Sequence, residues 1–276
     1  MNKEMEKRYR IALTIAGSDP SGGAGLQADI KTMSALGVYA ASAIVAIVDE
    51  NTVGVYDVHP VPTRFVEGQI RSVIDDIGAD AIKIGMLHSS ELIMGVLRTL
   101  QRYPDIRNIV VDPVMVATSG DALLQPEAVA TLRDELIPCS RVITPNLPEA
   151  SLLLGEQITH QDQFEDAARA LSRQTGEKVS VMLKAGHIDD ETLTDIFYNA
   201  ETGKSMRLTT RRIDTPNTHG TGCTLSSAIA AWLAKGADLD TAVRKAKEYL
   251  AAALKAGAGY SIGHGHGPVH HFHPFY

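Results

Sequence analysis

The stretch IALTIAGSDPSGGAG at residues 11–25 joins a short apolar segment to a glycine-rich one, and it decides the fold class. Residues 11–16 are apolar or β-branched, which is the composition of a strand buried on both faces. The glycines that follow predict a tight loop, and residues 26–36 continue with the pattern of a helix. A buried strand, a glycine loop and a helix in succession indicate an α/β fold.

The same alternation continues along the chain. Between two apolar runs, Val66, Ile70, Val73, Ile74 and Ile77 form one face of a helix. The short apolar runs are predicted to be buried parallel strands, and they occupy residues 43–48, 81–87, 109–116, 141–144 and 179–184. A β-hairpin is predicted within residues 193–213, and two amphipathic helices close the chain. We therefore expect an α/β fold with a central, mostly parallel β-sheet and helices on both faces.

Length and composition indicate a single domain over residues 1–276. Apolar residues make up 44% of the chain and charged residues 21%, close to the average of globular domains. We expect residues 1–9 and 263–276 to be loosely ordered tails. The second tail holds half of the ten histidines, but their glycine spacing gives no fixed ligand geometry for a metal ion.

Charge and cysteine content argue against several classes of protein. The formal net charge of −7 disfavours a nucleic-acid partner, which requires clustered positive charge. The two cysteines, Cys139 and Cys223, lie far apart and support neither a disulfide framework nor a zinc site. No apolar run reaches the roughly 20 residues that cross a bilayer, and the charged N-terminus lacks the pattern of a signal peptide. We expect a cytoplasmic protein that does not bind membranes.

The glycine loop at residues 19–25 has three functional interpretations besides a flexible turn. A Walker A loop is excluded because Ile30, not glycine, precedes Lys31. Residues 23–28 match the dinucleotide pattern G-x-G-x-x-A, with acidic residues roughly 20 positions on, but the first glycine lies too far from the strand. The third interpretation is a loop whose amides, with Asp19 or Asp29, approach a small polar substrate.

A second loop of small residues, Asn217 to Thr224, leads into the first of the two closing helices. Amide groups that converge at a helix N-terminus stabilise anions, so a transferring phosphoryl group would suit this position. The same dipole predicts a lowered pKa for Cys223. The cysteine could then be a nucleophile with His219 as its base, a base for a substrate hydroxyl, or a small buried hydrophobe.

Polar residues follow several of the predicted strands, where ligands gather in open α/β sheets. Asp112, Asn146 and Glu149 are oxygen donors of the kind that Mg²⁺ prefers, often through water. Lys184 ends an apolar run, so its ammonium is expected to have a phosphate or carboxylate partner unless it reaches the surface.

These segments together resemble the hydroxymethylpyrimidine/phosphomethylpyrimidine kinases of thiamine biosynthesis, within the ribokinase-like superfamily. The resemblance covers most of the chain and rests on residues 15–25, 83–87, 112–116, 144–150 and 219–224. It implies an enzyme that phosphorylates the hydroxymethyl group of the pyrimidine and then the monophosphate in one site, with ATP as co-substrate and Mg²⁺ as cofactor. Members of the family are commonly homodimers.

The resemblance also implies roles for individual residues. Gly220, Thr221 and Gly222 would form an anion hole, and Cys223 would stand where relatives carry an aspartate base. Glu50, Asp29, Gly17, Met86 and Val114 would bind the pyrimidine. Lys184, Asn146 and Gly222 would bind the nucleotide, while Asp112 and Glu149 would organise Mg²⁺, through water.

Glu50 departs from the family pattern, which usually has glutamine at this position. A glutamine amide both donates and accepts hydrogen bonds, whereas an ionised carboxylate only accepts. Either Glu50 or the ring nitrogen must therefore carry a proton, and we expect pyrimidine binding to tighten as the pH falls. The departure keeps a pyridoxal/pyridoxine kinase open as an alternative. More distant alternatives are an NAD-binding oxidoreductase and a binding module without turnover.

Overall fold

The structure is a computed structural model, which describes residues 8–115, 123–186, 188 and 190–276. Its main sheet has eight strands in the order β10-β9-β8-β7-β6-β5-β1-β2. The strands are β1 (Ile11–Ala16), β2 (Tyr39–Ile44), β5 (Ala81–Ile84), β6 (Ile109–Val111), β7 (Val142–Ile143), β8 (Ser180–Leu183), β9 (Thr192–Asn199) and β10 (Lys204–Arg211). Six of them run parallel, and β9 and β10 form an antiparallel hairpin beside β8. The predicted mostly parallel sheet and the hairpin are confirmed.

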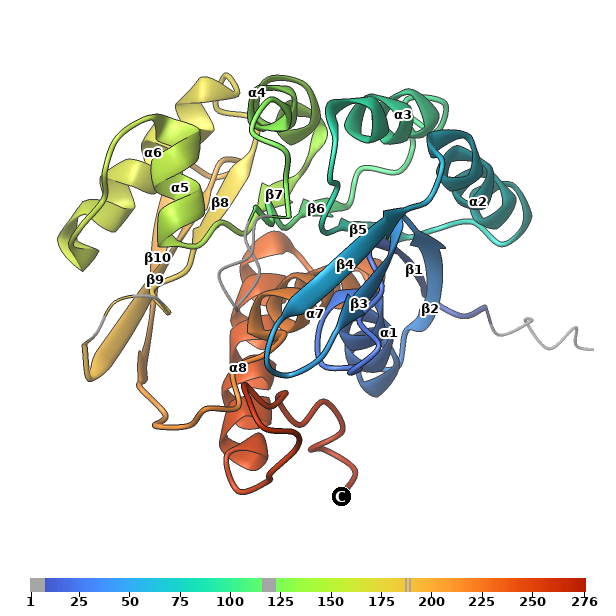
Figure 1. Ribbon diagram of the computed structural model, residues 1–276. Coiled ribbons are helices and arrows are strands. Elements are labelled where there is room, and N and C mark those ends of the chain that lie inside the picture. Colours follow the sequence, from blue (N-terminus) through green and yellow to red (C-terminus); the bar gives the residue numbers. More distant parts are fainter. Residues whose placement is uncertain (1–7, 116–122, 187, 189) are drawn as a thin grey trace, which may run out of the picture.

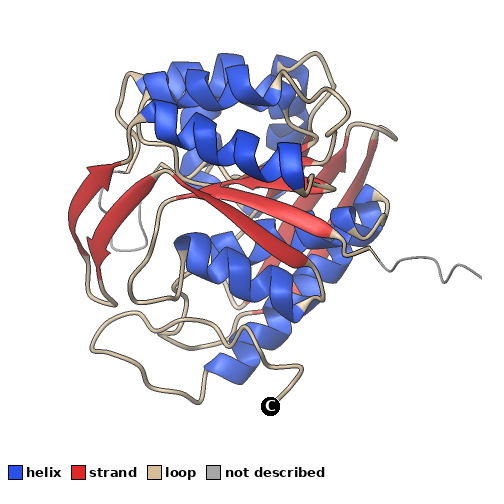
Figure 2. Ribbon diagram, turned by 90° about the vertical axis from the view of Figure 1, so that its right-hand side faces the viewer, coloured by secondary structure: helices blue, strands red, loops and turns tan. Residues whose placement is uncertain are grey.

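Helices cover both faces of this sheet, as predicted (Figures 1 and 2). One layer contains α2 (Thr63–Asp76), α3 (Ser90–Leu100), α4 (Ala128–Thr131), α5 (Leu147–Leu154) and α6 (Phe164–Gln174), with short helical turns η1 (Leu132–Leu136), η2 (Ile137–Cys139) and η3 (Gln161–Gln163). The other layer contains α1 (Gly25–Ala35), α7 (Thr221–Ala234) and α8 (Leu239–Gly257). The pleat explains the two cores, because Leu13 and Ile15 enter the first and Ala12 the second.

A second, two-stranded sheet lies near the carboxyl end of β1. It pairs β3 (Ala46–Glu50) with β4 (Val55–Pro60) in antiparallel register. The prediction of one buried strand over residues 43–48 is therefore wrong, because the chain leaves the main sheet at Val45 and β3 exposes alternate side chains. The apolar run hides this break, since its sequence contains no glycine or proline.

The C-terminal segment also differs from its prediction. Residues 263–276 are packed against the protein rather than loosely ordered: Val269 and His271 are buried, and the His270 amide donates to the Ala253 carbonyl of α8 at 3.1 Å. Glycine-rich sequence suggested mobility, but here glycines permit close contact between chain segments. Of the other predicted tail, residues 1–7 lie outside the described residues, and Arg8 and Tyr9 are exposed. No helix in the described part of the chain is long and apolar enough to cross a membrane.

Candidate active site

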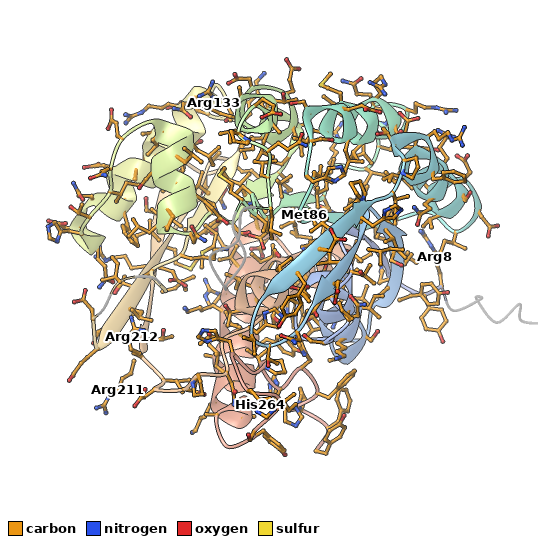
Figure 3. All side chains as sticks on the ribbon, viewed as in Figure 1. Arg8, Met86, Arg133, Arg211, Arg212 and His264 are labelled. Atoms are coloured by element: carbon orange, nitrogen blue, oxygen red, sulfur yellow. The ribbon has the colours of Figure 1, made fainter. Side chains whose placement is uncertain are left out.

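A cavity of about 580 Å³ opens at the carboxyl ends of the parallel strands. The chain order reverses between β1 and β5, which is the place where open α/β sheets bind ligands. Predicted site residues come together here from separate segments, among them Gly17 after β1, Glu50 on β3, Met86 after β5, Asp112 after β6, Lys184 after β8 and Cys223 on α7. Figure 3 shows Met86 near the middle of the molecule and Arg211 and Arg212 at the end of β10.

The turn before α7 is built for close approach of backbone groups. Gly220 has a φ of 78°, and a Cβ there would overlap the carbonyl oxygen of Gly23. Only glycine therefore fits. α7 begins at Thr221, so its first amide groups have no partner within the helix. The Thr221 amide donates to the Thr218 carbonyl at 3.3 Å, and Gly222 and Cys223 line the cavity at the positive end of the helix dipole. A Cβ on Gly222 would lie 3.4 Å from both the Asp112 carboxylate and the Lys184 ammonium, so Gly222 lies beside this ion pair.

Cys223 is not the reactive thiol that its position at a helix N-terminus suggested. Burial raises its pKa to about 12; the Lys83 ammonium opposes this effect, and the carboxylates of Asp29 and Asp112 add to it. The predicted lowered pKa is wrong, because desolvation outweighs the dipole. The Nε2 atom of His219 lies 2.8 Å from an Asp19 oxygen, and no hydrogen bond joins His219 to Cys223 among the described residues. A Cys223–His219 nucleophilic pair is therefore absent from the described residues.

Asp19 organises the glycine loop. Its carboxylate accepts hydrogen bonds from the amides of Ser21, Gly23 and Ala24 at 2.7, 2.9 and 2.6 Å. Burial alone would raise the pKa of Asp19, but the hydrogen bonds from His219, Ser21 and Ala24 hold it below its ordinary value. The amides that a dinucleotide pyrophosphate would require are thus already bound to Asp19, and this contradicts the dinucleotide interpretation.

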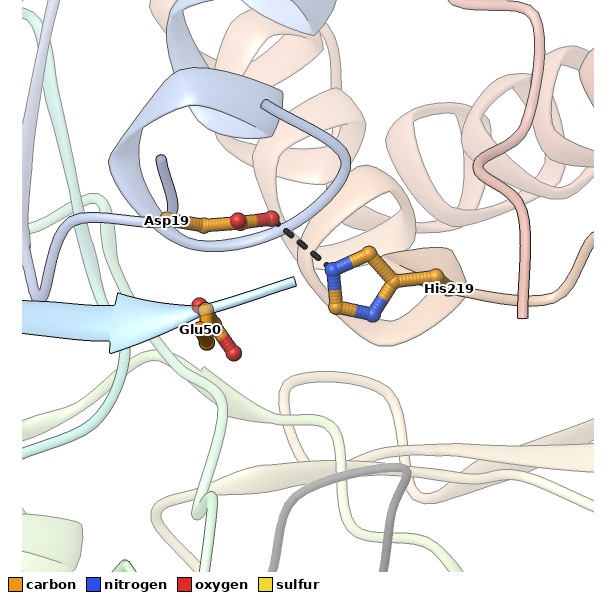
Figure 4. A group of neighbouring side chains, drawn as sticks. All are labelled: Asp19, Glu50 and His219. Carbon is orange, nitrogen blue, oxygen red and sulfur yellow. Dashed lines mark hydrogen bonds and ion pairs between the residues drawn. The ribbon is translucent and has the colours of Figure 1, made fainter. Parts of the chain in front are cut away.

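Glu50 lies beside Asp19 and His219, as Figure 4 shows. One ligand-type atom of each of the three side chains lies within 4.8 Å of the others. Burial, and then repulsion from Asp19, raises the pKa of Glu50 to about 7. The carboxyl therefore changes charge near neutral pH, on the wall of the cavity where the sequence predicted pyrimidine binding.

A second charged cluster surrounds Lys184 across the cavity. Its ammonium lies 3.1 Å from Asp112, which also accepts from Thr144 at 2.9 Å. Burial favours the neutral form of Asp112, but the ammonium groups of Lys184 and Lys83, together with the hydrogen bonds from Lys184 and Thr144, outweigh it and lower the pKa. Glu149 and Asn146 form a reciprocal capping box at the start of α5, with bonds of 2.7 and 2.9 Å. Burial raises the pKa of Glu149 to about 7, although Lys184 opposes this effect.

Asp29 is the predicted site residue that the structure does not bring to the cavity. It is fully buried and forms a 2.8 Å ion pair with Lys83, which is also fully buried. Thr14 and Ser227 donate further hydrogen bonds to Asp29 at 2.5 and 2.6 Å. Burial alone would lower the pKa of Lys83, but the Asp29 carboxylate holds it above its ordinary value. Among the described residues Lys83 lines the cavity and Asp29 does not, so Asp29 lies beneath the site.

Comparison with known proteins assigns the family. A family model described as phosphomethylpyrimidine kinase matches residues 19–270. The chain belongs to this family. It is 51% identical over 263 residues to the hydroxymethylpyrimidine/phosphomethylpyrimidine kinase of Rhizobium meliloti, covering 95% of this chain and 97% of that protein. It is 48% identical over 267 residues to the enzyme of the same description from Escherichia coli, covering 96% and 98%.

Solved structures of related kinases have the same fold as this chain. An ADP complex of Bacillus subtilis pyridoxal kinase has a TM-score of 0.85 at 39% identity and covers 95% of this chain and 97% of the other. A phosphomethylpyrimidine kinase from Clostridium difficile has a TM-score of 0.75 at 40% identity, covering 87% and 97%. The ribokinase-like expectation is confirmed, while the oxidoreductase alternative has no support from the family.

Three parts of the phosphomethylpyrimidine kinase site were missed in the sequence. Lys83 was overlooked although a charged residue in the middle of a predicted buried strand is a usable signal. His219 was considered only as a base for Cys223. The wall formed by Thr210, Arg212 and Leu250, from the end of β10 and from α8, carries no motif and could not be found.

Proposed function

We propose that this chain transfers a phosphoryl group from ATP to the hydroxymethyl group of 4-amino-5-hydroxymethyl-2-methylpyrimidine, and then a second one to the resulting monophosphate, in thiamine biosynthesis. The family and its two closely similar curated members support this activity. The single structural observation that carries it is the turn Gly220–Cys223, which faces the Lys184 ammonium inside the cavity that also contains Glu50. This arrangement suits an anion in transfer, with a polar ring held at its side.

The pyrimidine would bind between β1, β3 and β5. Gly17 allows Met86 to approach the end of β1, because a Cβ there would lie 2.8 Å from the Met86 methyl group. Met86 and Val114 line the same part of the cavity and offer apolar contacts to the ring faces. Glu50 would bind the amino group and ring nitrogen. Asp29 would contribute through Lys83 rather than by contact with the substrate.

Transfer would depend on positioning and charge stabilisation. The amides of Gly220, Thr221 and Gly222 would hold the transferring phosphoryl oxygens, and Lys184 would neutralise their charge. Asn146 lines the cavity and pairs with Lys184 in a parallel β-bridge, so it would bind the nucleotide beside this lysine. Cys223 would contribute little as a base for the substrate hydroxyl, because a pKa of about 12 leaves very little thiolate at neutral pH. A loose phosphoryl-transfer transition state also has little need of a base.

Asp112 and Glu149 suit a Mg²⁺ ion held through water. Both are buried carboxylates on the cavity wall, and the repulsion from Asp112 contributes to the raised pKa of Glu149. A divalent cation would relieve that repulsion, and carboxylate oxygens are its preferred ligands. The bound ion would supply charge neutralisation for the ATP phosphates.

A pyridoxal or pyridoxine kinase is the second candidate, because the Bacillus subtilis pyridoxal kinase has the same fold. Steady-state kinetics on hydroxymethylpyrimidine and on pyridoxal decide between the two. We expect kcat/KM to be higher for the pyrimidine by at least about a hundredfold, because buried polar groups of the site that stay unpaired with the wrong substrate lower its kcat/KM. A higher kcat/KM for pyridoxal would overturn the substrate assignment and retain the kinase class.

The homodimer and the cytoplasmic location stay predictions. Tyr39, Ile47 and Tyr56 expose 51%, 58% and 62% of their surface on β2, β3 and β4, and this apolar edge is where we would place a second copy. Light scattering of the purified protein tests the dimer, and cell fractionation tests the location.

A further inference from the structure

The segment Gly263–Pro268 lies between two parts of the active site that are far apart in sequence. On one side is the turn that joins β3 to β4, which follows Glu50. On the other is the loop before α7 that contains His219. The motif GHGHGP in this segment has no role in the transfer chemistry described above.

Three successive amides of the segment bind one residue of the β3–β4 turn. The amides of His264 and Gly265 each donate to the Thr52 hydroxyl at 3.2 Å, and the amide of His266 donates to the Thr52 carbonyl at 2.8 Å. Thr52 is two residues beyond Glu50, so these bonds restrain the end of the strand that carries the carboxyl.

The other end of the segment binds the loop before α7. The His219 amide donates to the Gly267 carbonyl at 3.0 Å, and His219 pairs with Pro268 in a parallel β-bridge. His219 in turn contacts Asp19, whose neighbour in the cluster is Glu50. Beyond Pro268, His271 lies 3.2 Å from the Thr224 hydroxyl on the first turn of α7. The segment is thus anchored to the helix that carries the anion-binding turn.

Alternate glycines make these contacts possible. A Cβ at Gly263 would overlap the Thr52 side chain, one at Gly265 would overlap the Thr52 carbonyl, and one at Gly267 would overlap the Asn217 side chain. The spacing of two residues places each glycine where the backbone meets its neighbour. A loop that merely covered the surface would not require glycine at these positions.

We propose that Gly263–Pro268 is a positioning segment for the pyrimidine end of the site: by joining Thr52 to His219, it fixes Glu50 relative to the anion-binding turn. The proposal rests on the proposed kinase function, and it adds that a segment outside the cavity wall contributes to the specificity for the pyrimidine. Pyrimidine affinity depends on the distance between Glu50 and the anion-binding turn, because the ring must reach Glu50 while its hydroxymethyl group reaches the turn. Nucleotide affinity does not depend on it.

The substitution Gly265→Ala tests the proposal, with Gly259→Ala as its matched control. A Cβ at Gly259 meets no atom within 4 Å, whereas the one at Gly265 displaces Thr52. For Gly265→Ala we expect the KM for hydroxymethylpyrimidine to rise about tenfold, the equivalent of one net hydrogen bond, while the KM for ATP stays near that of Gly259→Ala. The thermal midpoint of Gly265→Ala should fall below that of Gly259→Ala, because the Thr52 backbone must shift. Equal pyrimidine KM values for the two variants, or parallel increases in both substrates' KM values, would overturn the proposal.

A second variant keeps the test independent of steric damage. Thr52→Val removes the acceptor of two amides while keeping the side-chain shape, and we expect a smaller rise in the pyrimidine KM, about threefold. In a Glu50→Ala background, Thr52→Val should have no further effect, because it acts through Glu50. A full additional effect in that background would contradict the proposal. If the wild-type protein does not phosphorylate the pyrimidine, the proposed function fails instead.

Discussion

The charge state of Glu50 gives the most detailed prediction. Its pKa of about 7 means that the free protein binds a proton there as the pH falls through neutrality. Pyrimidine binding requires the protonated carboxyl, or a proton on the ring nitrogen, to complete the pair of hydrogen bonds. The sign is therefore fixed: affinity is highest below pH 7 and falls as the pH rises, by up to tenfold per pH unit.

The size of the effect follows from the same pKa. With a pKa of about 7, the protonated fraction falls from about 90% at pH 6 to about 3% at pH 8.5. The dissociation constant for hydroxymethylpyrimidine should rise by about 30-fold over this interval, which corresponds to about 2 kcal/mol. Isothermal titration calorimetry measures this change directly, and in two buffers of different ionisation enthalpy it also reports the uptake of about one proton at pH 8.

Glu50→Gln is the matched control, because it keeps the size and polarity of the side chain and cannot titrate. Asp19 stays ionised over this range, since its pKa lies below the ordinary value, and His219 is retained in the variant. Any slope left in Glu50→Gln therefore does not come from the Glu50 carboxyl. Equal slopes for the two proteins would refute the reasoning, and a flat profile for the wild type would do so as well.

Three further predictions concern transfer and stability. Gly222→Val should lower kcat by about a hundredfold to a thousandfold in a coupled ADP assay, because its side chain would enter the space beside Lys184; an unchanged kcat would remove the anion-binding role of the turn. Cys223→Ala should lower kcat by less than about tenfold, since the thiol is neutral at pH 7, and a loss above about a hundredfold would restore the cysteine as an essential base. Lys83→Met should reduce the free energy of unfolding, measured in urea, by about 3–5 kcal/mol, because it leaves the Asp29 carboxylate buried without its partner. A change below about 1 kcal/mol would contradict the importance of the ion pair.

The strands of the sheet were predictable where a continuous apolar run marks a strand that is buried on both faces. Buried parallel strands are continuous apolar runs, and this marked the runs that became β1, β5, β6 and β8. The break between β2 and β3 was not predictable, because strand residues on both sides of Val45 are equally apolar and the departure is fixed by hydrogen bonds from Ser18 and Val45 to neighbouring segments.

The site was predictable where backbone geometry dictates residue type. Gly220 must be glycine for its positive φ and its approach to Gly23, so the motif was visible in the sequence. The charge states were not visible: Cys223 lies at a helix N-terminus, yet burial decides its pKa. Asp29 was predicted to bind the substrate and Lys83 was overlooked, and only the fold shows that the two form an ion pair beneath the cavity.

The most direct test of the central claim is the stoichiometry of ADP formation. Purified protein is incubated with Mg²⁺, excess ATP and a limiting amount of hydroxymethylpyrimidine, and ADP and the pyrimidine products are quantified at completion. The account predicts two ADP per pyrimidine, with the monophosphate formed first and the diphosphate at the end. ADP formation that does not depend on the pyrimidine, or a reaction that stops at one ADP with monophosphate as the final product, would contradict it.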